Sequence, residues 1–211
     1  MGRLKSEVKG ALRKCKHLCI KITALKINRQ VKIRNLRRDA QSGKWLLPEE
    51  QETAKVLLNL IVPSDTETPG VDDIDVLGPS AIEVLDKLIA RRPERQVIYA
   101  RGLLCFDIWA REVYGRAIGE IDVEGQLNLV SSAEMLWKRT REGRSVFAKV
   151  RNPVAEMIVH ARGGRLFAAE LFNQIRNDCL RIFYTSRVGW IWLEYDGPPM
   201  DEGYPKLSKR H

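Results

Sequence analysis

The stretch ERQVIYARGLLCFDIWAREV, residues 94–113, decides the fold class, because it is long enough for a helix and carries apolar side chains on several sides. Leu103, Phe106 and Trp109 are among these side chains, so we expect a central, buried helix. Apolar periodicity predicts further helices on both sides of it, at about 48–62, 79–91, 123–140 and 164–183. The expected fold is therefore mainly α, with one compact helical domain.

The C-terminal tail, residues 184–211, lacks a helical period and is rich in glycine, proline and aromatic residues, so we expect long irregular backbone. Trp190 and Trp192 would lie on the same side of an extended segment, with Ile191 opposite. The tail either covers the domain's own core or forms an interface, because tyrosine and tryptophan often anchor interfaces. The hypothetical interface residues are Phe183, Tyr184, Trp190, Trp192, Tyr195, Pro198 and Tyr204.

The N-terminal region carries the basic excess of the chain. Residues 1–38 contain 13 of the 36 lysines and arginines and one of the 27 acidic residues, and the net charge of the whole chain is +9. The rest of the chain is slightly acidic, so the basic charge belongs to an arm. We expect two parts: a basic amphipathic arm and linker at 1–40, and a helical domain at 41–211.

Within the arm, residues 4–25 are predicted to form an amphipathic helix whose basic residues lie outside its apolar stripe. Three roles remain open for it, namely docking on a partner protein, attachment to an anionic membrane surface, and contact with nucleic acid. Nucleic acid is the least favoured partner because the segment has no aromatic residue for base stacking. The main residues of the stripe are Leu4, Val8, Leu18, Ile22 and Leu25.

Catalytic and metal-binding motifs are absent from the sequence, so we expect neither catalytic residues nor a cofactor in this chain. His160 lies in an apolar stretch that is typical of a structural histidine. Cys105 and Cys179 also lie in apolar settings, which favours buried thiols over a disulfide. The sequence has no long apolar run and no recognisable signal peptide, which by itself predicts a cytoplasmic protein.

Three segments, in order, resemble the gluconate 2-dehydrogenase subunit 3 family. They are LLNLIVPSDTETPGVDDIDV at 57–76, YARGLLCFDIWAREVYGRAIGEIDVEGQLNLV at 99–130, and FNQIRNDCLRIFYTSRVGWIWLEYDGPPMDEGYP at 172–205. The resemblance implies a small, non-catalytic subunit that stabilises, or helps to assemble or export, a flavoprotein. Its expected partner is a catalytic, FAD-binding (GMC-type) dehydrogenase subunit that oxidises CH–OH groups of sugars or sugar acids, with a cytochrome c subunit as a further component.

The resemblance also implies a periplasmic or inner-membrane-associated complex, because the family's small subunit commonly carries a Tat export signal. In this chain the basic arm stands in the place of that signal, and the twin arginine Arg37-Arg38 is followed by polar residues. A second class of function stays open beside the first. It is a free-standing helical interaction protein whose basic arm binds an anionic membrane or nucleic acid.

Overall fold

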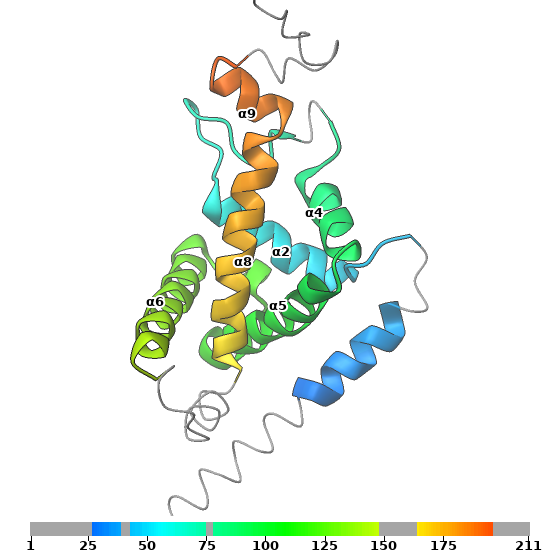
Figure 1. Ribbon diagram of the computed structural model, residues 1–211, viewed down its shortest axis with the longest axis vertical. Helices are drawn as coiled ribbons and strands as arrows, with labels where there is room; N and C mark the ends of the chain where they lie inside the picture. The colour runs from blue at the N-terminus through cyan, green and yellow to red at the C-terminus, as the bar shows by residue number, and fades with distance from the viewer. Residues whose placement is uncertain (1–26, 39–42, 75–77, 148–163, 196–211) are drawn as a thin grey trace, which may run out of the picture.

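The computed structural model describes residues 27–38, 43–74, 78–147 and 164–195, with the backbone alone for 141–147. A helix at 27–38 precedes the main elements, and the described residues are otherwise helices joined by turns and loops, as Figure 1 shows. The mainly α fold class is confirmed. The main elements are α2 (Pro48–Ile61), α4 (Ala81–Ala90), α5 (Pro93–Tyr114), η1 (Ile118–Glu120), α6 (Val123–Phe147), α8 (Arg165–Tyr184) and α9 (Arg187–Trp192).

Local signals account for where the helices begin and end. Proline occupies the first turn of both α2 and α5, where its missing N–H costs no intrahelical hydrogen bond. Ser80 caps α4 by accepting a hydrogen bond from the backbone N–H of Glu83 at 3.3 Å. Gly115 ends α5 with a φ of 73°, in the left-handed region that glycine adopts without strain. These boundaries lie within a few residues of those predicted.

Helix α8 occupies the centre of the bundle, where it contacts α2, α4, α5, α6 and α9. It runs along the long axis of the molecule in Figure 1, with α5 passing across it. Helix α5 was predicted to be buried, and Tyr99, Leu103 and Phe106 on it are indeed inaccessible to solvent. The two helices approach closely at Gly102, where a Cβ atom would lie 2.3 Å from Cβ of Leu171.

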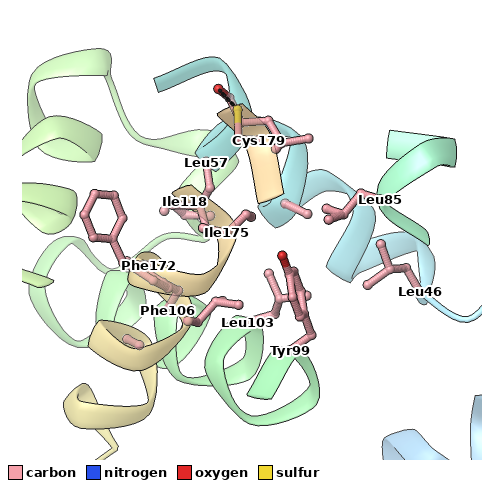
Figure 2. Close-up of a cluster of buried hydrophobic side chains, with 14 of the residues drawn as sticks. Leu46, Leu57, Leu85, Tyr99, Leu103, Phe106, Ile118, Phe172, Ile175 and Cys179 are labelled. Carbon is pink, nitrogen blue, oxygen red and sulfur yellow. Dashed lines mark hydrogen bonds between the residues drawn. The ribbon is translucent and has the colours of Figure 1, made fainter. Parts of the chain in front are cut away.

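The mainly apolar core contains a buried polar network between α5 and α8. Figure 2 shows side chains of α2, α5 and α8, among them Leu57, Phe106 and Ile175, converging on the same space. Within this core Asp178 accepts a hydrogen bond from the Tyr99 hydroxyl at 2.9 Å and pairs with Arg95 at 2.9 Å. Because a buried charge is tolerated only when it is paired, this network fixes how α5 sits on α8.

The helix at 27–38 packs on the body through apolar contacts and several ion pairs. Ile27 belongs to the hydrophobic core, and Arg34 and Arg38 both bind the carboxylate of Glu50, which is 1% exposed. Arg38 also stacks over the Trp45 ring, 4.1 Å from its centroid. The sequence analysis placed Ile27, Arg34 and Arg38 in the arm, and the structure shows that the helix carrying them contacts the domain. The domain boundary near residue 40 remains a prediction, and the expected helix at 4–25 lies outside the described residues.

The expected irregular backbone of the tail does not begin at residue 184. Residues Arg187–Trp192 form the short helix α9. The prediction that Trp190 and Trp192 lie in an extended segment and share one side is therefore wrong. Successive helical residues turn by about 100°, so two residues that are two apart point to nearly opposite sides. Residues 196–211, including Pro198 and Tyr204, lie outside the described residues.

Candidate partner interface

A tight turn between α8 and α9 builds the surface on which the aromatic residues lie. The Ser186 hydroxyl donates to the carbonyl oxygen of Phe183 at 2.7 Å and accepts from the backbone N–H of Gly189 at 3.1 Å. This is a helix N-cap, which satisfies one of the free N–H groups in the first turn of α9. Gly189 fits because a Cβ atom there would lie 2.2 Å from the Phe183 carbonyl oxygen. The turn thus folds α9 back beside the end of α8.

Trp190 stabilises the segment that runs from the end of α8 through α9, between Tyr184 and Tyr195. Its indole N–H donates to the carbonyl oxygen of Tyr184 at 3.0 Å, and its ring meets that of Tyr195 edge to face at 6.2 Å. The backbone N–H of Tyr195 donates to the Trp190 carbonyl oxygen at 2.8 Å, with Glu194 in the left-handed region at a φ of 52°. Trp190 is half-buried. The contacts just described are with Tyr184 and Tyr195, at the two ends of this segment.

Phe183 supports the segment from the core. It is 3% exposed, and its ring lies 5.4 Å from that of Tyr184 and 6.1 Å from that of Trp192, both edge to face. Because the Phe183 side chain is covered, it offers little surface to a partner. Its contacts fix the positions of two aromatic rings that do face solvent.

Five apolar and aromatic side chains at the end of α8, on α9 and just after it are exposed, and we call this set the α9 patch. Ile191 and Leu193 belong to it although the sequence analysis did not select them. Isolated exposed apolar residues are common on proteins, but a group of them next to one another is typical of interaction sites. The five members are each between 44% and 61% exposed, and they are Tyr184, Ile191, Trp192, Leu193 and Tyr195.

A hollow of about 240 Å³ lies beside α9, between the end of α8 and the residues before α4. Ile74 and Val84 line its apolar part, and Ser186 and Arg187 line its side toward α9. The exposed aromatic side chains and the recess lie on neighbouring residues at the end of α8 and on α9. That combination suits an interface in which each partner inserts a side chain into the other.

Three titratable side chains of the described core have raised pKa values. Burial raises the pKa of the Cys105 and Cys179 thiols to about 12, which keeps both protonated and unreactive at neutral pH. Burial, and next the charge of Asp178, raises the pKa of Tyr99 well above its ordinary value. Cys105 and Cys179 are free and buried, which confirms that prediction. His160 lies outside the described residues.

The described residues show neither a cluster of metal ligands nor a membrane-spanning helix. No group of three His, Cys, Asp or Glu side chains in that part of the chain is placed to hold a metal ion. Among the described helices, none is both long enough and apolar enough to cross a lipid bilayer. The arm residues Leu4, Val8, Leu18, Ile22 and Leu25 lie outside the described part.

Comparison with known proteins identifies a family. Residues 48–197 match the family model described as Gluconate 2-dehydrogenase subunit 3. The matched segment begins with α2 and includes α9, and it covers more than half of the chain. No curated protein and no solved structure gives a significant match. The match confirms the resemblance seen in the sequence.

Proposed function

The chain belongs to the gluconate 2-dehydrogenase subunit 3 family, and on that premise we propose that it is a non-catalytic small subunit of an FAD-dependent sugar or sugar-acid dehydrogenase complex. In this proposal it binds the catalytic flavoprotein subunit and stabilises it or assists its assembly. The family name supports a role as a subunit of a dehydrogenase. The choice of a binding role rests on one observation, the exposed α9 patch.

The α9 patch supports this role because its side chains are already held in place. Phe183 packs against Tyr184 and Trp192, so these two rings are partly immobilised before any partner arrives. Side chains that are fixed beforehand lose less conformational entropy on binding. Large aromatic side chains also bury much apolar area when covered, which is why they supply much of the binding energy of many interfaces.

A pull-down of the flavoprotein dehydrogenase subunit from the same host tests the proposal. The variant Trp192→Ala removes an exposed indole, and we expect it to weaken capture of the flavoprotein by about tenfold or more, since about 1.4 kcal/mol corresponds to a factor of ten. Leu127→Ala is the matched control, because Leu127 is 46% exposed on α6, which is distinct from the patch. Capture of a yellow, flavin-containing partner that is equally strong with both variants would reject the patch as its binding surface.

The alternative function, attachment to an anionic membrane, draws support from the helix at 27–38. Ile33 and Leu36 on this helix are 49% and 60% exposed, and Arg29 and Lys32 are exposed on the same helix. Apolar and basic side chains on one short helix are typical of segments that lie on anionic lipid. Flotation of the full chain with vesicles containing phosphatidylserine tests this function. Flotation that Ile33→Ser/Leu36→Ser abolishes would support it.

A further inference from the structure

A second surface, separate from the α9 patch, is a groove between the helix at 27–38 and the first half of α5. Its volume is about 620 Å³, and the loop before α2 contributes Lys44 and Trp45 to its lining. Figure 1 shows the two helices that contribute to its lining, the blue helix at 27–38 and α5. Along α5 the lining extends from Pro93 to Arg101. Eight helical steps of about 1.5 Å make this length about 12 Å.

The charge of the groove is one-sided. Arg38, Lys44 and Arg101 line it, and none of the described residues in its lining carries a carboxylate. Arg38 is engaged by Glu50, whereas Lys44 and Arg101 form no ion pair with any residue that the structure describes. Arg101 stacks over the Phe167 ring at 5.5 Å, which holds its side chain in position. Two unpaired cations therefore face a groove that also receives the positive end of the α5 helix dipole.

The groove also presents apolar surface. Val97 on α5 is 52% exposed, and Val31 and Trp45 are half-buried in the same lining. An occupant that matches this lining carries negative charge and at least one apolar side chain. A single small anion would leave the apolar surface uncovered.

From this lining we propose that the groove binds an extended acidic peptide segment of a partner protein, with carboxylates at Lys44 and Arg101 and an apolar side chain on Val97. At about 3.3 Å per extended residue, a groove length of about 12 Å accommodates three or four residues. Ion pairs between the peptide carboxylates and Lys44 and Arg101 make the groove prefer acidic peptides. The apolar contact with Val97 adds affinity. This binding site is independent of the α9 patch and of the proposed function.

The test uses the full chain and a rhodamine-labelled hexapeptide of alternating glutamate and leucine, followed by fluorescence anisotropy at low salt. We expect Lys44→Gln/Arg101→Gln to weaken peptide binding by about tenfold or more. The control Lys55→Gln/Arg116→Gln removes the same charge from exposed positions elsewhere, on α2 and just after α5, and is expected to change binding less than about twofold. Each variant is first checked for a cooperative melt.

Val97→Glu is the second variant, since it places a carboxylate in the groove at an exposed helical position and does not depend on the Arg101–Phe167 contact. It is expected to weaken binding of the acidic peptide as well. Equal weakening by the groove and control pairs would overturn the proposal. So would groove variants that abolish binding to phosphatidylserine vesicles but leave peptide binding intact. Peptide binding that appears only after removal of residues 196–211 would assign the groove to this chain's own C-terminal residues and overturn a partner segment.

Discussion

The contact between α5 and α8 and the segment around α9 use the same kinds of side chain for opposite purposes. Tyr99 and Phe106 are inaccessible because α8 and its neighbours cover α5, whereas Trp192 and Tyr195 are about half exposed because α9 packs mainly on the end of α8. Residue type therefore does not decide whether an aromatic group builds the core or faces a partner. The number of elements that cover it decides. The following predictions test this difference, beginning with the largest expected effect.

Thiol chemistry measures how closed the α5–α8 region is. In a Cys15→Ser/Cys19→Ser background, we expect Cys105 and Cys179 to react with an alkylating reagent about a thousandfold more slowly in the folded protein than in urea. The reason is that burial raises the pKa of both thiols from 9.0 to about 12, which lowers the thiolate fraction near neutral pH by about that factor. Mass spectrometry over time gives the rates, and similar folded and unfolded rates would show an open core.

The same thiols predict how stability changes with alkaline pH. Their raised pKa means that the folded protein keeps protons that the unfolded chain releases above about pH 9. Their contribution to stability is therefore complete below about pH 9 and is lost as the pH rises toward about 12. Urea unfolding at a series of pH values measures this loss, and Cys105→Ala/Cys179→Ala should reduce the slope.

Asp178→Ala tests the buried network between α5 and α8. It leaves Arg95 and the Tyr99 hydroxyl without their carboxylate in the core, so we expect a loss of about 3–5 kcal/mol and a melting temperature lower by on the order of 10 °C. Asp107→Ala is the control. It removes a more exposed ion pair, between Asp107 and Arg111 within α5, and should cost less than about 1 kcal/mol. Calorimetry would contradict the buried role if the two variants melted alike.

Gly102→Ala tests the close approach of α5 and α8. The added Cβ atom would lie 2.3 Å from Cβ of Leu171, so the helices must separate, and we expect a loss of about 1–3 kcal/mol despite the higher helix propensity of alanine. At Gly119 the nearest group to an added Cβ atom is 3.9 Å away, and Gly119→Ala should stay within about 0.5 kcal/mol of wild type. A denaturation curve that does not distinguish them would mean that the helices adjust freely.

Trp190→Ala tests the segment around α9 and should cost less stability than Asp178→Ala or Gly102→Ala. It removes the hydrogen bond to Tyr184 and the contact with Tyr195, for an expected loss of about 1 kcal/mol. Trp192→Ala should leave the melting temperature nearly unchanged, because its indole is 44% exposed. A larger loss of stability for Trp192→Ala than for Trp190→Ala would reverse the roles assigned to the two side chains.

The sequence predicted the long helices well because their apolar residues repeat over several turns. Helix α5 is an example, since its buried face could be recognised from Leu103, Phe106 and Trp109. Helix α9 was missed because its six residues are too few to show a period. Ser186, just before α9, is a residue type that often caps helices. Its capping role is seen only in the structure, where its hydroxyl accepts a hydrogen bond from the Gly189 N–H.

Three members of the α9 patch were among the residues that the sequence analysis selected. Tyr184, Trp192 and Tyr195 were selected from composition, and all three are exposed. The sequence could not separate them from Phe183 and Trp190, because burial depends on the way that α9 folds back on α8. Ile191 was missed for the same reason, since an extended segment would have placed it opposite the two tryptophans. The groove beside α5 depends on contacts between distant segments, which no local pattern reveals.

The ion pairs of Glu50 affect where the protein can be cut. The family match begins at residue 48, but Glu50 is 1% exposed and takes its two guanidinium partners, Arg34 and Arg38, from upstream of that point. A fragment that starts at the family boundary would also lose Ile27 from the core. We therefore expect a fragment that begins at residue 27 to be more stable than one that begins at residue 48, where the family match starts.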